Sequence, residues 1–125
     1  MDEALFYRCE RCGNIVALIR KGGGVLSCCG AAMTPLKANS TDAAHEKHVP
    51  VVKKDGDRVT VTVGSVAHPM EEKHYIEWIA LVSGETISVV KLKPGMKPQA
   101  EFTCAGEKAT AYAYCNLHGL WKADI

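Results

Sequence analysis

The clearest alternation of apolar and polar positions runs from Val59 to Val63, where valines at every second position are separated by threonines. A period of two indicates a strand with one buried face. Similar short apolar runs, bounded by turn residues, predict further strands at 49–53, 74–82, 86–92, 100–104 and 109–114. Pro50 favours a sheet edge, and Asp55-Gly56 favours a hairpin turn. With no convincing helical stretch, residues 45–125 are predicted to form an antiparallel β-sandwich of immunoglobulin-like type.

Residues 1–36 have a different composition, in which four cysteines stand close together. Cys9 and Cys12 form a Cys-x-x-Cys knuckle, and Cys28 and Cys29 follow a glycine-rich turn. A segment this short cannot bury enough apolar surface to be stable alone. We therefore expect a small N-terminal domain stapled by a tetrathiolate metal site. The polar residues 37–44 are predicted to link it to the sandwich domain, so that the whole chain is mostly β.

The identity of this metal depends on the second cysteine pair. Tetrahedral sulfur ligation suits zinc and iron alike. Cys28 and Cys29 are adjacent, unlike the second Cys-x-x-Cys of a zinc ribbon, and the chain must bend sharply for both to reach one ion. This difference favours iron. The even number of cysteines also permits disulfides, but the chain opens on acidic residues without a signal-peptide pattern, which favours metal binding in the cytoplasm.

Composition and charge exclude some partners. The 125 residues carry a formal net charge of +1, and the charged residues make up 23% of the chain. Basic and acidic residues are mixed, and Phe occurs only twice, so base stacking has little support. No apolar run reaches the 18 or so residues of a membrane-spanning helix. The sequence therefore predicts neither a nucleic-acid partner nor a membrane partner.

A second candidate site begins at the C-terminal turn, where Cys115 and His118 are three residues apart. Upstream, His48, His68 and His74 each lie in a loop or at a strand end. A lone histidine in such a place is usually an exposed or hydrogen-bonding residue, but distant loops of a sandwich can bring several together. Four imidazoles and one thiolate are one ligand too many for a tetrahedral zinc site. Spacing alone leaves open whether they converge.

These motifs together resemble desulfoferrodoxin, the two-iron form of superoxide reductase. The resemblance covers nearly the whole chain and is carried by Cys9-x-x-Cys12 with Cys28-Cys29, by Glu46-Lys47-His48-Val49-Pro50, by the segment from Gly64 to His74, and by Cys115-Asn116-Leu117-His118-Gly119. The N-terminal cysteines resemble those of desulforedoxin. The family implies one-electron reduction of superoxide to hydrogen peroxide, without dismutation, using electrons from an external donor.

The resemblance also implies two non-haem irons with distinct ligands. The first would be tetrahedral, and its ligands would be Cys9, Cys12, Cys28 and Cys29. The second would be square-pyramidal, with equatorial imidazoles from His48, His68, His74 and His118 and the thiolate of Cys115 on the axis. The sixth position would be open, or taken by Glu46 after oxidation. The family further implies a homodimer and a small electron-donor protein such as rubredoxin.

Lys47 is the candidate for attracting and positioning superoxide, because an ammonium beside an open metal position raises the local concentration of an anion. Two other functions remain open: an electron-transfer protein working through the tetrathiolate iron, and a zinc-ribbon binding module fused to a β-sandwich. His45 and Cys104 match no ligand position. Trp78 and Trp121 are predicted to pack in the core or in an interface, and Asn116 is predicted to shape the C-terminal turn.

Overall fold

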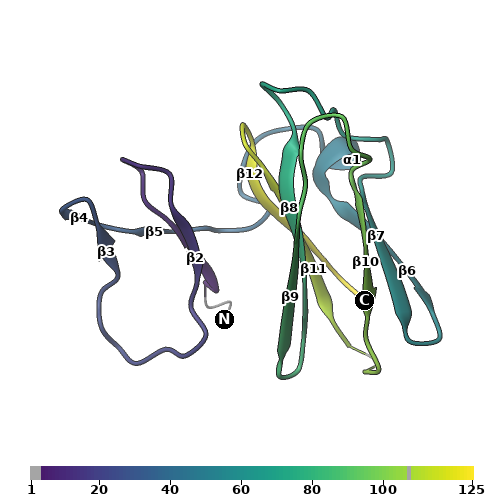
Figure 1. Ribbon diagram of the computed structural model, residues 1–125, viewed down its shortest axis with the longest axis horizontal. Coiled ribbons are helices and arrows are strands. Elements are labelled where there is room, and N and C mark those ends of the chain that lie inside the picture. Colours follow the sequence, from purple (N-terminus) through teal and green to yellow (C-terminus); the bar gives the residue numbers. More distant parts are fainter. Residues whose placement is uncertain (1–3, 107) are drawn as a thin grey trace. The chain divides into compact units, whose positions relative to one another are not determined.

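The computed structural model describes residues 4–106 and 108–125, and the chain divides into two compact units, Met1–Lys37 and Ala38–Ile125 (Figure 1). The first unit is built from very short strands. One sheet has the order β2 (Ile15–Ala17), β1 (Phe6–Arg8), β5 (Thr34–Pro35), and a separate hairpin joins β3 (Ser27–Cys28) to β4 (Ala31–Ala32). Among its described residues only Phe6 and Cys9 are buried. A unit with so little core needs another source of stability.

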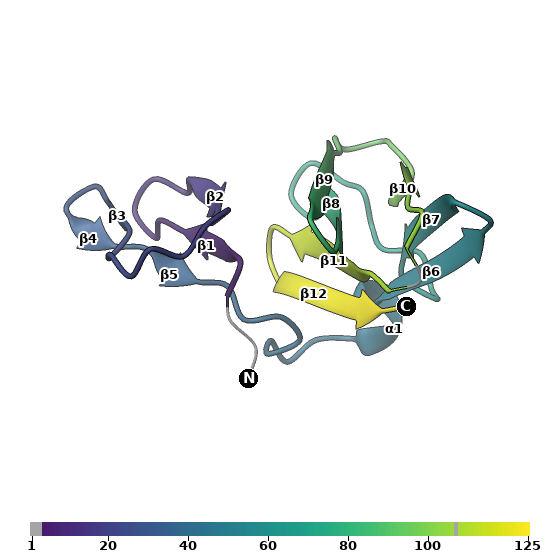
Figure 2. The same ribbon diagram turned by 90° about the horizontal axis from the view of Figure 1, so that it is seen from below.

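The second unit consists of two antiparallel sheets and one helical turn, α1 (His45–His48). The three-stranded sheet has the order β10 (Gln99–Thr103), β7 (Arg58–Val63), β6 (Pro50–Asp55). The four-stranded sheet has the order β12 (Gly119–Asp124), β11 (Thr110–Cys115), β8 (Ile76–Ser83), β9 (Thr86–Lys91). In Figure 2 the two sheets form opposite layers of this unit.

The two sheets share one hydrophobic core. In β7 the residues Val59, Val61 and Val63 are fully buried while their neighbours are not, as the period of two predicted. The inward side chains of β10, β8 and β11 meet them in one cluster. Burial of this continuous cluster between the sheets is the main source of the unit's stability. The predicted mostly β fold with an immunoglobulin-like sandwich is confirmed.

A β-bulge in β8 turns Ile76 inward, opposite Cys115. The register between β11 and β8 shifts between Tyr114, opposite Trp78, and Cys115, opposite Ile76. Because a bulge places an extra residue in one strand, it changes which side chains face inward. Ile76 consequently joins the core beside Cys115, which faces inward by the regular alternation of β11, whereas the rings of Trp78 and Tyr114 stack with their centroids 5.6 Å apart.

Most of the predicted strands are present, and the differences are local. Pro50 begins the edge strand β6, and Gly56 takes a φ of +62° in the turn that joins β6 to β7. The prediction missed α1, a single turn closed by the bond from the Val49 N–H to the His45 carbonyl, 2.9 Å. One turn is too short to show helical periodicity.

The prediction also missed β12, since Gly119 was assigned only to a turn. Gly119, with a φ of +79°, reverses the chain, and β12 then pairs with β11 from Cys115–Gly119 to Thr110–Asp124. Asn39 contacts β12 as well, since its N–H donates to the Leu120 carbonyl, 2.9 Å. A division into domains at 1–36 and 45–125 with a linker between them stays a prediction.

Candidate metal centres

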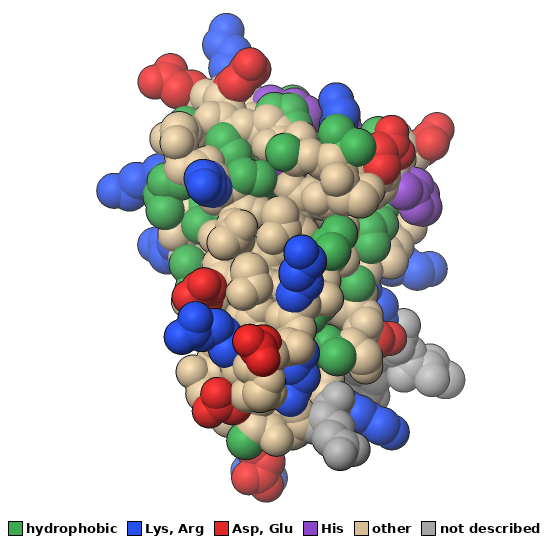
Figure 3. Space-filling model, turned by 90° about the vertical axis from the view of Figure 1, so that its right-hand side faces the viewer, with side chains coloured by type: hydrophobic (Ala, Val, Ile, Leu, Met, Phe, Trp, Pro, Cys, Tyr) green, Lys and Arg blue, Asp and Glu red, His purple; other side chains and the backbone are tan. Residues whose placement is uncertain are grey.

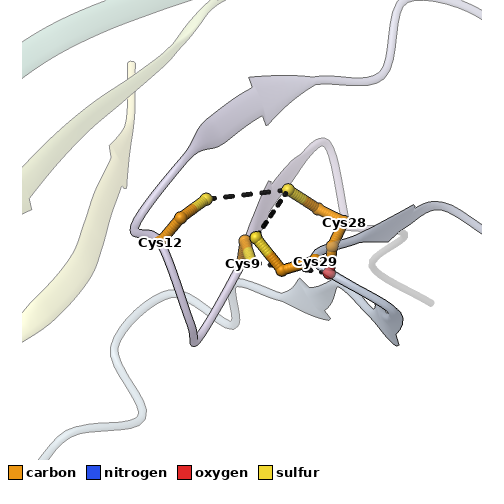
Figure 4. Close-up of side chains that lie close together, drawn as sticks. All are labelled: Cys9, Cys12, Cys28 and Cys29. Carbon is orange, nitrogen blue, oxygen red and sulfur yellow. Dashed lines mark hydrogen bonds between the residues drawn. The ribbon is translucent and has the colours of Figure 1, made fainter.

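Four thiols of the first unit point toward one another (Figure 4). The sulfurs of Cys12 and Cys28 are 3.6 Å apart, and those of Cys28 and Cys29 are 3.9 Å apart. The thiol of Cys9 donates to the Cys28 carbonyl, 3.7 Å. Metal–sulfur bonds of about 2.3 Å in a tetrahedron place sulfurs about 3.8 Å apart. The spacing of these sulfurs therefore fits one tetrahedral metal ion.

The local backbone explains how the four thiols reach one point. On the first knuckle, the Gly13 N–H donates to the Cys9 carbonyl, 2.9 Å, and Gly13 takes a φ of +84°. On the second, Cys29 and Gly30 have φ values of +54° and +75°. These left-handed conformations bend the chain sharply. The bend lets the adjacent thiols of Cys28 and Cys29 face one ion.

The pKa values of the cysteine thiols indicate that a bound cation is needed for all four to ionise. The N–H groups of Cys12 and Arg11 lower the pKa of Cys9 to about 6. The pKa of Cys29 is instead raised to about 12, chiefly by its hydrogen bond with Cys12 and then by that with Cys28. The Cys9 thiol therefore loses its proton readily, whereas the Cys29 thiol keeps its proton. A bound metal ion would favour the thiolate form of all four cysteines, because its positive charge offsets their negative charges.

The second group of possible ligands comes from four separate places in the second unit. His48 ends α1, His68 lies in the loop after β7, His74 precedes β8, and Cys115 ends β11. One ligand atom from each lies within 4.8 Å of all the others. His118 joins them from the turn between β11 and β12, with its Nδ1 3.1 Å from His48 Nε2 and 3.8 Å from Cys115 Sγ. Histidine side chains are visible at the upper end of this unit in Figure 3, among scattered charges of both signs.

The four imidazole rings are arranged like the corners of a square. Neighbouring centroids are 4.7 Å apart for His48 and His68, 4.7 Å for His68 and His74, 5.1 Å for His74 and His118, and 4.8 Å for His118 and His48. His48 and His74 are 6.4 Å apart, as across a diagonal. Neighbouring rings are close to perpendicular, between 75° and 89°. Such an arrangement suits four equatorial ligands.

The ring hydrogen bonds show which nitrogens face the ion. Nδ1 of His48 and Nδ1 of His68 each lie 2.7 Å from a backbone carbonyl, of Ala44 and Pro69 respectively. A carbonyl only accepts, so both Nδ1 atoms are protonated and both Nε2 atoms carry a lone pair. Burial lowers the pKa of His48, and lowers that of His68 to about 4, so both rings are neutral near pH 7.

These two lone pairs face each other, since the Nε2 atoms of His48 and His68 are only 3.2 Å apart. Two acceptors cannot form a hydrogen bond, and a cation bound by both nitrogens removes the repulsion. Nitrogens bound about 2.1 Å from one ion at right angles lie about 3 Å apart. Nε2 of His74 is a buried atom without a hydrogen-bond partner. A metal ion would satisfy it too.

The thiol of Cys115 is fully buried at the edge of this group. Burial raises its pKa, and the N–H groups of Leu117 and His118 act in the opposite direction. A bound cation adds the missing stabilisation of the thiolate. The described residues therefore contain two groups that fit two metal centres, a tetrathiolate site and a histidine–cysteine site.

Glu46 and Lys47 are both exposed on α1, next to His48. The positive charge of Lys47 adds to burial in lowering the pKa of His48 and of His74. Its ammonium therefore lies within electrostatic range of both rings. The Glu46 carbonyl accepts from the Val66 N–H, 2.8 Å, and from the Ser65 hydroxyl, 3.2 Å. The loop after β7 thus supports α1.

Close approach between this loop and α1 depends on Gly64. A Cβ at position 64 would lie 2.6 Å from the Glu46 carbonyl oxygen and 2.9 Å from the Lys47 carbonyl carbon. Atoms at such distances overlap, so only glycine fits without displacing α1. The sequence shows a glycine here, but nothing in the local pattern tells which backbone it touches.

Trp121 supports two of the imidazoles, which the sequence did not predict. Its ring stacks on His48 with centroids 4.9 Å apart, and its Nε1 donates to the His118 carbonyl, 3.1 Å. His45 meets the edge of the same indole, 5.3 Å between centroids. Cys104 is buried outside both groups, where its thiol donates to the Ser83 hydroxyl, 3.2 Å.

Comparison with known proteins is consistent with this geometry. Residues 40–124 match the model of the family described as desulfoferrodoxin, and residues 2–36 match that of its N-terminal domain. The desulfoferrodoxin of Nitratidesulfovibrio vulgaris (Hildenborough) is 54% identical over 118 residues, which cover 94% of either chain. A protein from Pyrococcus abyssi named superoxide reductase is 35% identical over 105 residues, covering 69% of this chain and 91% of that one.

Among solved structures, the superoxide reductase from Treponema pallidum superposes with a TM-score of 0.78 at 33% identity, covering 98% of this chain and 99% of its own. No helix in the described part of the chain is long and apolar enough to cross a membrane. The family matches together span almost the entire sequence, and each of the two matched regions contains one of the two ligand groups. The chain belongs to the desulfoferrodoxin family.

Proposed function

We propose that this protein is a superoxide reductase that converts superoxide, one electron and two protons into hydrogen peroxide. The main observation in support of this function is the square of four imidazoles beside one buried thiol. Five donors are one fewer than an octahedral ion accepts, and neutral imidazoles suit ferrous iron. When bound, such an iron supplies the electron and an open coordination position for a small anion.

Three of the ligands have roles that follow from their own contacts. His48 and His68 are held in one tautomer by their Nδ1–carbonyl bonds, so their Nε2 lone pairs stay directed at the ion. The Cys115 thiolate would bind from outside the square of rings and, as a strong electron donor, would favour electron transfer to the substrate. The N–H groups of Leu117 and His118, which stabilise this thiolate, moderate that donation.

Lys47 and Glu46 are proposed to act at the open side. The ammonium of Lys47, within electrostatic range of two of the rings, attracts superoxide and holds a water that delivers protons. The carboxylate of Glu46 would serve as a further ligand after oxidation. Both residues are exposed on the single turn α1, which leaves their side chains free to move toward and away from the site.

The tetrathiolate group is proposed to hold a second iron. The sulfur spacing fits tetrahedral iron and zinc alike, so the family resemblance and the adjacent cysteine pair carry the choice of iron. Metal analysis with the visible spectrum tests it directly, because ferric thiolate absorbs strongly in the visible range and zinc, a d¹⁰ ion, does not. About two irons per chain are expected, and one zinc without colour would contradict the proposal.

The reaction itself is tested by product stoichiometry in the prereduced protein. A reductase forms one hydrogen peroxide per superoxide and releases no dioxygen. Release of one dioxygen for every two superoxide ions would identify a dismutase and refute the proposal. Cys12→Ser separates this function from simple electron transfer, because it disrupts only the tetrathiolate site. The prereduced variant should still react; loss of the reaction would place the working centre in the first unit.

A homodimer, a small electron-donor protein such as rubredoxin, and a cytoplasmic location are further parts of the proposal and rest on the resemblance. Size-exclusion chromatography with light scattering measures the first. Reduction of the oxidised protein by reduced rubredoxin, followed spectroscopically, tests the second. Cell fractionation tests the third.

A further inference from the structure

The side chain of Asn116 binds the backbone on both sides of His74. Its Nδ2 donates to the carbonyl of Lys73, 3.0 Å, and its Oδ1 accepts from the N–H of Tyr75, 2.9 Å. The Asn116 N–H also donates to the Tyr75 carbonyl, 3.2 Å. Asn116 therefore bridges the residues immediately before and after one imidazole, although about forty residues separate them in sequence.

His74 depends on its backbone more than His48 and His68 do. The rings of His48 and His68 are oriented by their own bonds to carbonyls, 2.7 Å each. The His74 ring, in contrast, makes no hydrogen bond within the part of the chain that the structure describes, and its Nε2 is buried without a partner. Its segment is short and precedes β8, with one backbone bridge to Glu71. The two peptide groups that flank it are the ones that Asn116 holds.

Asn116 is itself tied to the other ligands, because it directly follows Cys115 in the turn that leads to His118. Its amide nitrogen donates and its amide oxygen accepts, and each meets the complementary backbone group of the His74 segment. A carboxylate could accept from the Tyr75 N–H but would repel the Lys73 carbonyl. The amide thus couples the placement of His74 to that of the thiolate.

We propose that Asn116 is a positioning residue that places His74 in register with Cys115 and His118 for metal binding. The proposal rests on the proposed function only in that the histidine–cysteine group binds a metal ion. Residues that orient a ligand in this way typically change metal affinity about tenfold to a hundredfold when removed. Asn116→Ala is expected to weaken the second site by that factor and leave the tetrathiolate site unchanged.

Cobalt(II) titration of the metal-free full-length chain tests this, with the thiolate-to-cobalt charge-transfer band and competition by a chelator as readouts. His74→Ala identifies the band of the second site. Asn39→Ala is the matched control, because Asn39 makes an equivalent pair of amide bonds to Lys122, 3.3 Å and 2.9 Å. Asn116→Ala should weaken cobalt binding at least about tenfold, and Asn39→Ala should not. Equal effects of the two variants would overturn the proposal.

A double-mutant cycle separates positioning from a general loosening of the turn. If Asn116 acts through His74, Asn116→Ala has no further effect on cobalt affinity once His74 is already alanine. A full effect in the His74→Ala background would refute the coupling. Failure of the unaltered chain to bind a second cobalt would instead overturn the metal site, and this proposal with it.

Two further measurements apply even if Asn116→Ala fails to fold. Asn116→Asp keeps the acceptor, loses the donor and places a carboxylate against the Lys73 carbonyl, so it should weaken cobalt binding; unchanged affinity would count against the proposal. In the metal-free unaltered chain, the Tyr75 N–H should exchange slowly with solvent, because the Asn116 oxygen protects it. Exchange as fast as in an exposed loop would show that the bridge does not form, whatever the metal does.

Discussion

Acidification should destabilise the metal-free second unit, and His68 allows the size of this effect to be calculated. Only 3% of the residue is exposed, and burial lowers the pKa of His68 from 6.5 to about 4. Below pH 6.5 the unfolded chain binds a proton at this imidazole while the folded chain does not. The contribution of His68 to the free energy of unfolding is therefore fully present above pH 6.5 and is lost as the pH falls toward about 4.

The expected magnitude follows from about 1.4 kcal/mol per pH unit. Between about pH 7.5 and about pH 5, His68 should lower the free energy of unfolding by about 2 kcal/mol. Burial lowers the pKa of His48 and His74 as well, so their contributions have the same sign. The drop for the whole unit should therefore exceed that from His68 alone.

Urea unfolding of the metal-free chain at the two pH values measures this drop. Tryptophan fluorescence reports on the second unit alone, because Trp78 and Trp121 are the two tryptophans of the chain. His68→Gln cannot titrate in this range, and comparing each protein with itself at two pH values cancels the cost of the substitution. The variant should show a drop smaller by about 2 kcal/mol. An equal drop in both proteins would refute the reasoning.

Four other substitutions test the roles of single residues. Lys47→Ala should slow the second-order reaction with superoxide and weaken its salt dependence, as followed by pulse radiolysis; an unchanged rate at low salt would argue against steering. Glu46→Ala should alter the absorption spectrum of the ferric second centre, and an identical spectrum would exclude ligation. Gly64→Ala, whose Cβ would lie 2.6 Å from the Glu46 carbonyl oxygen, should displace α1 and lower the free energy of unfolding by about 1–3 kcal/mol in urea titrations. Ile79→Ala, at a fully buried position, should cost about 2–5 kcal/mol while leaving cobalt affinity at the second site unchanged, so weaker cobalt binding would link core packing to the site.

Much of the fold could be predicted because its signals are local. The alternating valines of β7 indicate a strand through their own period, and Pro50 and Gly56 mark an edge and a turn by their own backbone preferences. What the pattern missed is held by distant partners. Strand β12 forms because it pairs with β11 and covers the core with Trp121, and α1 is a single turn supported by the loop after β7.

The two metal centres differ in the same way. The sequence by itself determined the tetrathiolate group, because a Cys-x-x-Cys knuckle and an adjacent cysteine pair need only short turns to face one ion. Spacing could not determine the second group, whose ligands come from α1, from residues 68–74, and from the end of β11 and the turn after it. The family resemblance named its residues and implied four equatorial imidazoles, but the contacts that bring these rings together are found only in the tertiary structure. Strand register, the bulge in β8, the stacking of Trp121 on His48 and the amide bridge of Asn116 are all contacts between distant residues. Local sequence sets backbone conformation, whereas only packing and long-range hydrogen bonds determine where separate segments meet.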